Sequence, residues 1–257
     1  MKYGICLIAV APVRLSPDDR SEMVSQMLFG ELAEILETKE KWLSVRLLHD
    51  NYSGWISQGQ ITVLSDDDFE NLDNATKWVN TDLVQVLENK SKNASFLVTG
   101  GSSFYNCDEG HFKLLGDEFV YHGGMNQVKD FDRDLLVNSA MMFLHCPYLW
   151  GGRSALGIDC SGLTQLVYKI AGKSIFRDAS QQATQGEIIN LIHEALPGDL
   201  LFFDNEEEII NHVGILLDSE HILHAHQKVR IDKIDHQGIF NTDIKKYSHN
   251  LRLIKRM

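Results

Sequence analysis

The sequence predicts an α+β protein in which β-rich amino-terminal segments precede a domain with a helix packed on an antiparallel sheet. Short strand-like runs fill residues 1–65, an apolar helical period follows Cys160, and alternating runs with turn signals continue from residue 199. The chain has 257 residues, which exceeds one small domain. Two or three domains are therefore expected.

The first segment, residues 1–65, is expected to form a small all-β barrel. Its apolar runs ICLIAVAPV, LAEILET, WLSVRLL and GWISQ are separated by Asp, Gly and Asn. The opening MKYGICLIAVAPVRL has one lysine and a short apolar run that enters the strand pattern directly, which favours a strand over a signal peptide. No run of about 18 apolar residues occurs, so no membrane span is predicted.

The second segment, residues 66–125, is expected to begin with an acidic linker, SDDDFENLDN. A helix and the strand-like runs FLVTGG, GHFKLL and EFVYHG are expected to follow it. No internal repeat is visible that would relate this segment to the first.

Cys160 follows a glycine-rich loop, YLWGGRSALGIDCSG, and is predicted to lie in the first turn of a helix. Apolar residues recur at i, i+3, i+4 and i+7 from Leu163 to Ile170, and Gly172 provides a stop. One apolar face should therefore pack inward. Unsatisfied N–H groups at a helix start favour a thiolate over a thiol, which predicts a nucleophile. The alternative is a buried structural cysteine.

A short-stranded antiparallel sheet is expected after this helix. The runs are 199–203, 212–217, 221–226, 229–234 and 251–254. His212 opens one strand and His224 lies in the next, so a hairpin turning at 218–220 would bring the two imidazoles together on one face. A histidine in a strand is otherwise usually a satisfied polar residue.

A metal site is the competing interpretation, because His221, His224 and His226 form an H-x-x-H-x-H pattern. Strand alternation places His221 on the opposite face from the other two, and no C-x-x-C pair occurs to complete a tetrahedral set. No metal and no cofactor are predicted.

Residues 126–257 resemble the NlpC-type cell-wall peptidases, a papain-like cysteine peptidase family. The ordered motifs are PYLWGG, DCSGL, PGDLLFF, HVGI and the HA at residues 224–225. The resemblance implies an α+β papain-like catalytic domain with Cys160 as nucleophile, His212 as base and His224 as the group that orients His212. The Cys160 N–H and the Tyr148 phenol would stabilise the oxyanion.

Residues 1–65 resemble a bacterial SH3-like domain by SEMVSQMLFGE and YSGWI, and residues 66–125 are assigned as a second, divergent one. This arrangement resembles the γ-D-glutamyl-L-diamino acid endopeptidases, or dipeptidyl-peptidase VI subgroup. The resemblance implies hydrolysis after γ-D-glutamate in short murein peptides with a free L-alanine. The residues it implies for substrate binding are Glu22, Tyr52, Trp150, Asp159, Ser161 and Ser180.

Charge bears on the expected partners. The chain has 36 acidic and 24 basic residues, a net charge of −12, which disfavours nucleic acid and anionic membranes and supports small murein peptides as substrates. Four cysteines do not suggest a disulfide framework, so a cytoplasmic location is favoured, with a periplasmic one open if a signal was removed. A wall-binding module and a papain-like amidase or acyltransferase remain alternative functions.

Overall fold

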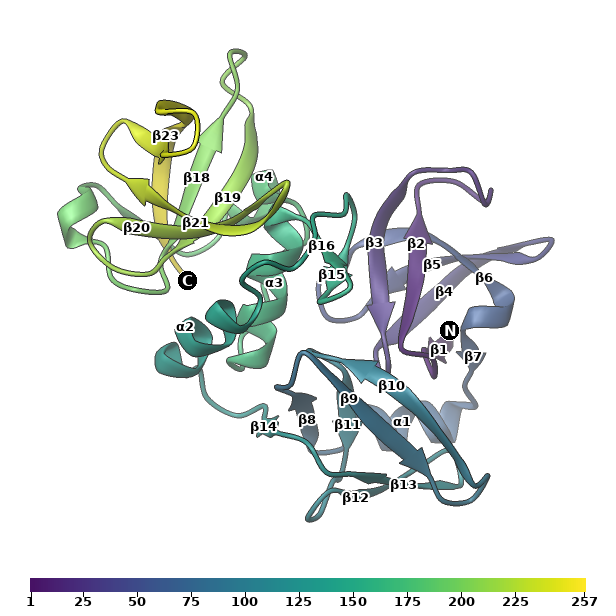
Figure 1. Cartoon of the computed structure of the whole chain (residues 1–257). Coiled ribbons are helices and arrows are strands. Elements are labelled where there is room, and N and C mark those ends of the chain that lie inside the picture. Colours follow the sequence, from purple (N-terminus) through teal and green to yellow (C-terminus); the bar gives the residue numbers. More distant parts are fainter. The chain divides into compact units, whose positions relative to one another are not determined.

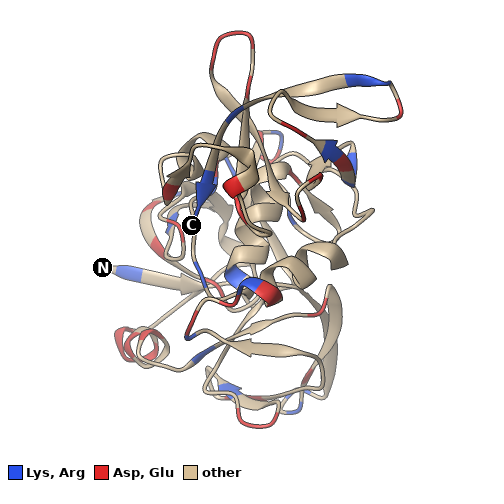
Figure 2. Cartoon of the chain, turned by 90° about the vertical axis from the view of Figure 1, so that its left-hand side faces the viewer, with Lys and Arg blue, Asp and Glu red and all other residues tan.

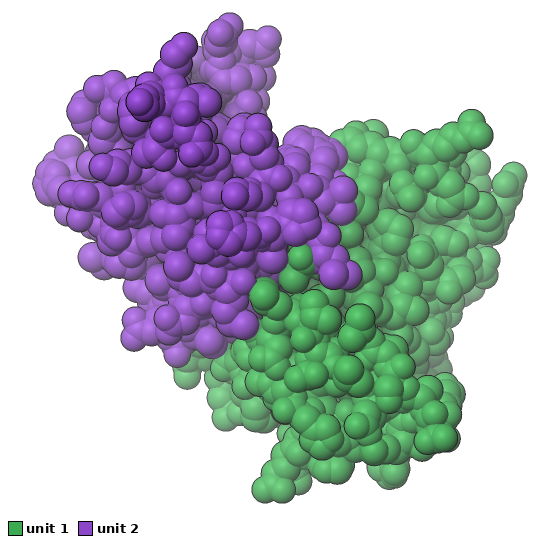
Figure 3. Space-filling model, in the orientation of Figure 1, with its two compact units in different colours: residues 1–130, 151–155 green, residues 131–150, 156–257 purple.

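The computed structural model describes residues 1–257, and the chain divides into two compact units (Figure 1, Figure 3). Unit 1 comprises residues 1–130 and 151–155, and unit 2 comprises residues 131–150 and 156–257. A short piece of unit 1, residues 151–155, therefore interrupts the sequence of unit 2 a few positions before the predicted nucleophile.

Unit 1 begins with an antiparallel sheet of seven strands. The elements are β1 (Lys2–Ile5), β2 (Val10–Arg14), β3 (Met23–Leu28), β4 (Leu32–Lys39), β5 (Trp42–Leu47), β6 (Ser53–Ser57), the 3₁₀ turn η1 (Gln58–Gln60) and β7 (Thr62–Val63), in the sheet order β3-β2-β6-β5-β4-β1-β7. Val13, Val45 and Ile56 are fully buried on its inner face. The strand-like runs predicted in residues 1–65 therefore form strands.

The rest of unit 1 contains one helix and two small sheets. The elements are α1 (Asp66–Asp73), β8 (Lys77–Asn80), β9 (Val84–Asn89), β10 (Ala94–Thr99), β11 (Ser103–Tyr105), β12 (His111–Leu114), β13 (Asp117–Tyr121) and β14 (Met125–Gln127), in the sheet orders β10-β9-β13-β12 and β11-β8-β14. Ile5 and Phe29 of the first sheet share one hydrophobic cluster with Leu87 and Phe104. This shared core makes residues 1–130 a single compact unit.

The expectation of an acidic linker after residue 65 is wrong, because Asp66–Asp73 form helix α1. The Ser65 side chain accepts the Asp68 N–H at 3.1 Å, and the three aspartates of the first turn lie where the helix dipole favours negative charge. Phe69 stacks on Tyr3 with ring centroids 3.5 Å apart. Capping and one aromatic contact thus stabilise a helix in a segment that its acidic composition suggested was a linker.

Unit 2 contains three helices and a barrel. Its elements are α2 (Arg133–Met142), β16 (Gly157–Ile158), α3 (Cys160–Ile170), α4 (Ala179–Gln182), β17 (Glu187–Ile189), the 3₁₀ turn η2 (Ile192–Glu194), β18 (Leu200–Asp204), β19 (Ile210–Leu216), β20 (His221–His226), β21 (Lys228–Ile234), β22 (Gly238–Asn241) and β23 (Lys246–Arg256); β15 (Arg153–Ser154) belongs to unit 1. The sheet order is β17-β23-β18-β19-β20-β21-β22, and an additional β22–β23 pairing closes it. The predicted antiparallel sheet is present. Its closure into a barrel was not predicted.

Barrel closure depends on one glycine. Gly238, in β22, has a φ of +144°, and a Cβ there would lie 1.9 Å from the His249 carbonyl oxygen on β23. No side chain fits at that distance, so glycine lets the two backbones approach closely enough to pair.

Helix α3 departs from the predicted one-sided amphipathic pattern. All of its residues except Lys169 are buried, and it contacts α2, α4, β19 and β20. Gly172, with a φ of +93°, terminates it as predicted. A helix covered by the sheet and by other helices needs apolar or hydrogen-bonded side chains all round.

Two properties of the whole chain bear on its environment. No helix is both long and apolar enough to span a membrane. Acidic positions, red in Figure 2, recur along the length of the chain.

Candidate active site

The predicted nucleophile begins α3 directly after an N-cap aspartate. Asp159 has extended backbone geometry, and its carboxylate accepts the Gly162 N–H at 2.7 Å. Cys160 is therefore the first helical residue, as the sequence predicts.

Cys160 is more buried than its place at a helix start suggested, since only 7% of the residue is exposed. Burial, and to a smaller extent the Asp159 charge, raise the pKa of the Cys160 thiol to about 12. Hydrogen bonding to the backbone of Val213 and Ser161, together with the Arg177 charge, lowers this pKa by less. The expected stabilisation of a resting thiolate is therefore wrong in direction, because desolvation outweighs the helix terminus.

The hairpin of β19 and β20 brings His212 and His224 together. The two strands pair in the register Gly214↔His224, and His212 Nε2 lies 2.8 Å from His224 Nδ1. His212 is 6% exposed and His224 is 1% exposed, so this contact is shielded from water.

A carboxylate that sequence reasoning missed extends the pair. His224 Nε2 lies 2.9 Å from Asp232 on β21, and Arg230 donates to both oxygens of that carboxylate at 2.6 and 2.8 Å. Because a carboxylate accepts a proton, His224 carries its hydrogen on Nε2 and accepts at Nδ1 from His212 Nε2. His212 is then left with an unprotonated Nδ1.

The electrostatics of this relay favour neutral imidazoles. Burial lowers the pKa of His212 well below its ordinary value, and the neighbouring histidines lower it further. Burial also lowers the pKa of His224, against the opposing effect of Asp232. Although burial alone would raise the pKa of Asp232, the hydrogen bonds from His224 and Arg230 bring it below its usual range. Asp232 is thus the ionised member of the relay.

Arg177 is a second functional candidate that the sequence did not reveal. Its guanidinium, which is 1% exposed, binds Asp159 through two hydrogen bonds of 3.0 and 2.6 Å and donates to Ser161 Oγ at 2.8 Å. Asp159, predicted to face a substrate ammonium, is thus already paired with a cation. Sequence patterns could not reveal this arginine, because Arg177 lies 17 positions after Cys160 and comes close to the cysteine motif only in the folded structure.

Tyr148, the predicted oxyanion donor, interacts electrostatically with the cysteine. Burial raises its pKa to about 12, and the charges of Cys160 and Asp159 contribute. The phenol is therefore protonated at neutral pH and able to donate a hydrogen bond.

Helix α4 carries Ser180 beside this site. Gln182 anchors the helix by donating to the Ser161 carbonyl at 3.0 Å, and Thr164 Oγ donates to Gln182 Oε1 at 2.8 Å. Ser180 itself is exposed. Ser161 and Ser180 thus belong to two helices held together by a buried amide.

The remaining predicted substrate residues lie on either side of the unit boundary. Trp150 is 61% exposed and belongs to unit 2, whereas Glu22 and Tyr52 belong to unit 1. Glu22 is exposed immediately before β3, and Tyr52 packs against the core of the first sheet.

A cavity of about 410 Å³ lies against His212 in unit 2. His249 of β23 also lines it, and the His249 ring stacks on that of His212 with centroids 4.2 Å apart. Strand alternation in the sequence could not place His249 beside His212, because this contact depends on which strands β23 pairs with in the closed barrel.

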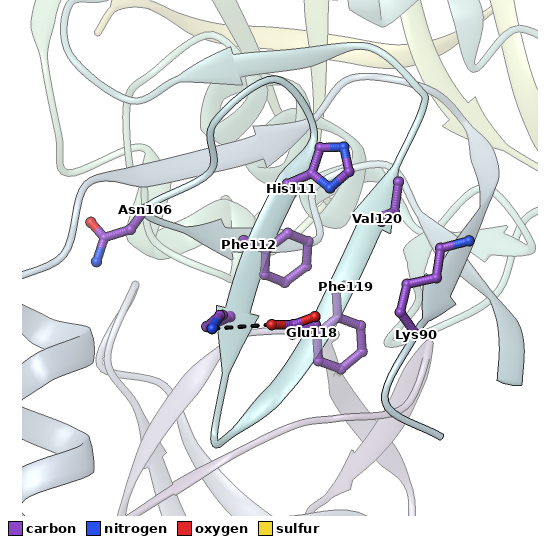
Figure 4. A pocket seen from close by; sticks show the side chains of 8 residues that line it. Lys90, Asn106, His111, Phe112, Glu118, Phe119 and Val120 are labelled. Atoms are coloured by element: carbon purple, nitrogen blue, oxygen red, sulfur yellow. Dashed lines mark ion pairs between the residues drawn. The ribbon is translucent and has the colours of Figure 1, made fainter. Parts of the chain in front are cut away.

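A separate cavity of about 630 Å³ lies in unit 1 along β12 and β13 (Figure 4). Phe112 and Phe119 point into it beside Lys90 and His111, and Lys113 forms an ion pair with Glu118 at 3.0 Å. It contains none of the predicted site residues.

Comparisons with known proteins identify the family of the two parts of the chain. Residues 145–247 match the NlpC/P60 family, and residues 13–61 match the bacterial dipeptidyl-peptidase SH3 domain. A γ-D-glutamyl-L-lysine dipeptidyl-peptidase of Bacillus subtilis (strain 168) is 32% identical over 78% of this chain and 71% of its own. Dipeptidyl-peptidase 6 of Lysinibacillus sphaericus is 28% identical over 91% of this chain and 92% of its own.

The fold has a close counterpart among solved structures. An NlpC/P60 family protein from Bacillus cereus ATCC 10987 superposes with a TM-score of 0.85 over 99% of both chains, at 20% identity. The motifs, the two family matches and these relatives lead to one conclusion: the chain belongs to the NlpC/P60 family and is a cysteine peptidase with an amino-terminal SH3-type domain.

Proposed function

We propose that the protein hydrolyses the bond between γ-D-glutamate and an L-diamino acid in short cell-wall peptides that begin with a free L-alanine. The observation that carries this proposal is the relay Asp232–His224–His212 in the unit whose first α3 residue is Cys160. The name of the Bacillus subtilis relative, γ-D-glutamyl-L-lysine dipeptidyl-peptidase, supplies the bond, and the family resemblance supplies the free L-alanine.

In the proposed reaction the Cys160 thiol transfers its proton to Nδ1 of His212 as its sulfur attacks the γ-carbonyl carbon. The Cys160 N–H and the Tyr148 hydroxyl donate to the oxyanion. The imidazolium returns the proton to the departing amine, which leaves an acyl thioester on Cys160. Water, deprotonated by His212, then hydrolyses the thioester and releases the dipeptide and the free thiol.

His224 and Asp232 hold His212 in the tautomer that this reaction needs. Asp232 fixes the proton of His224 on Nε2, so that His224 Nδ1 accepts from His212. As His212 becomes an imidazolium, the ionised Asp232 stabilises the positive charge through His224.

We propose that the free ammonium of the substrate binds beside Asp159, Ser161, Trp150 and Ser180. The Asp159 carboxylate already accepts from Arg177, so it offers less unbalanced negative charge than an isolated carboxylate. A further anionic or hydroxyl partner is therefore needed, and the family resemblance supplies Glu22 and Tyr52. Small peptides are the proposed substrates, used in turnover of wall material in the cytoplasm, in keeping with a net charge of −12.

The test compares L-Ala-γ-D-Glu-L-Lys with its N-acetylated form. The free tripeptide should release L-Ala-γ-D-Glu, and acetylation should lower kcat/KM at least tenfold, since losing a charge-assisted hydrogen bond in a desolvated site costs about 1.5–3 kcal/mol. Cys160→Ala should abolish release, whereas Cys146→Ala, a matched change in the same unit, should not.

Equal cleavage of both peptides would refute the amine pocket. Transfer of the acyl group to an added amine in preference to water would instead indicate an acyltransferase.

A further inference from the structure

Three histidines of unit 2 form a cluster, and two of them, His212 and His249, line the 410 Å³ cavity. One ring nitrogen from each of His212, His224 and His249 lies within 4.8 Å of the others. They come from β19, β20 and β23, so the barrel backbone holds all three. His249 has no part in the relay described above.

The nitrogen that His224 presents to this cluster, Nδ1, carries a lone pair and no hydrogen. Asp232 accepts from His224 Nε2 at 2.9 Å, which leaves Nδ1 as an acceptor. A carboxylate behind a histidine is the arrangement that orients metal-binding imidazoles and raises their basicity. Arg230 holds that carboxylate with two hydrogen bonds, so the support is rigid.

The cluster is also open to small cations. His212 and His249 line the cavity together with Asp204 and Glu206, whose charges favour cations there. Asp204 lies 3.6 Å from Arg252, a contact that offsets part of its charge.

We propose that His212, His224 and His249 form an inhibitory site for a divalent transition ion of the zinc type, with water in the fourth position. Imidazole is a preferred ligand of such ions, at a Zn–N distance of about 2.0–2.1 Å. Tetrahedral geometry then sets the nitrogens about 3.3 Å from one another, so the His212–His224 pair, now at 2.8 Å, separates slightly, and spacings of up to 4.8 Å shorten. His249, which is only half-buried, supplies the movement by tilting out of its stack on His212.

This cluster differs from the H-x-x-H-x-H set His221, His224 and His226, in which strand alternation places His221 on the opposite face. His212 of β19 and His249 of β23 take the places of His221 and His226.

Inhibition follows from the tautomer that a metal requires. An ion on Nε2 of His212 displaces the hydrogen bond to His224 and leaves the His212 proton on Nδ1. That nitrogen must be unprotonated to accept the Cys160 proton, so the predicted inhibition rests on the proposed function. Binding of the ion itself does not depend on the proposed function.

The activity test titrates Zn²⁺ against tripeptide hydrolysis by the wild type, His249→Phe and the matched control His226→Phe. Phenylalanine keeps a ring stacked on His212 but removes the ligand, and His226 lies next to His249 outside the cluster, with ring centroids 5.2 Å apart. The wild type and His226→Phe should lose activity at the same Zn²⁺ concentration and recover with a chelator. His249→Phe should need at least ten times more Zn²⁺, and inhibition at the wild-type concentration would overturn the proposal.

A second readout needs no substrate. Cys160→Ala protein should give the intense visible absorption of tetrahedral Co²⁺ on titration, and Cys160→Ala/His249→Phe should not. Absence of that spectrum in Cys160→Ala refutes the site. A spectrum that depends on His249, in a protein that cleaves no tripeptide, supports the site and refutes only the proposed function.

Discussion

Cys160 and His212 each resist ionisation for the same physical reason. Burial raises the pKa of the thiol to about 12 and lowers that of the imidazole well below its ordinary value. The position of Cys160 was predictable from the DCSG motif and the helical period, but its protonation was not. Burial depends on the packing of α3 against the sheet, which the sequence shows only in outline.

The resting enzyme should therefore hold a neutral thiol and a neutral imidazole at pH 7. The difference in absorbance at 240 nm between wild type and Cys160→Ala should show no thiolate at neutral pH. It should rise only in alkaline solution. A thiolate signal already saturated near pH 6 would show instead an ion pair formed before substrate binds.

Asp232→Asn should lower kcat roughly 10- to 100-fold with little change in KM, because an amide no longer fixes the proton of His224 on Nε2. Asp243→Asn is the matched control. Asp243 also accepts from Arg230, at 2.9 Å, but belongs to no histidine contact described here. Equal losses in the two variants would assign the effect to Arg230 rather than to the relay.

The β19–β20 hairpin is the element that assembles the site. Its two histidines were predictable, since period-2 alternation and a turn at 218–220 place them on one face. Asp232 was within reach of the same reasoning, because β21 pairs back on β20 in the register Ile222↔Asp232. His249 was not, because its position depends on closure of the barrel by β22 and β23. Sequence periodicity fixes faces within a hairpin but not which distant strand closes a sheet.

Gly214 sets how closely these strands pack beside His224. A Cβ at this position would lie 2.6 Å from Ile222 Cδ1 and 3.0 Å from His224 Cβ. Gly214→Ala should displace His224, lower kcat and cost about 1–3 kcal/mol of unfolding free energy. Gly59→Ala is the control, since a Cβ there meets nothing within 4 Å. Unchanged kcat and melting temperature in Gly214→Ala would show that the hairpin tolerates the added methyl group.

At the scale of the whole molecule, the sequence predicted the kinds of element in each part but not the boundary of the compact units. Residues 151–155 belong to unit 1 although unit 2 flanks them. Arg153, fully buried, donates two hydrogen bonds of 3.0 and 3.1 Å to Glu31 and one to the Gln26 carbonyl. A charged residue in a glycine-rich loop is expected to be exposed, and these partners, more than 120 positions earlier in the sequence, explain its burial.

Stability should fall in acid because the relay histidines are buried as neutral groups. Below about pH 6.5 the unfolded chain binds protons on His212 and His224, whereas the folded chain, with lowered pKa values, does not. Each histidine then removes up to about 1.4 kcal/mol of unfolding free energy per pH unit. Urea unfolding at pH 7.5, 6.5 and 5.5 measures this loss. His212→Asn should reduce its slope, and a slope equal to that of the wild type would contradict the assignment.

The central claim is that Cys160 carries the acyl group during hydrolysis. The most direct measurement is the intact mass of the enzyme after acid quenching during turnover of L-Ala-γ-D-Glu-L-Lys, followed by peptide mapping. An adduct with the mass of the L-Ala-γ-D-Glu acyl group is expected on the peptide that contains Cys160, sensitive to hydroxylamine and absent from Cys160→Ala. Turnover by Cys160→Ala, or an adduct on Cys6, Cys107 or Cys146 instead, would contradict it.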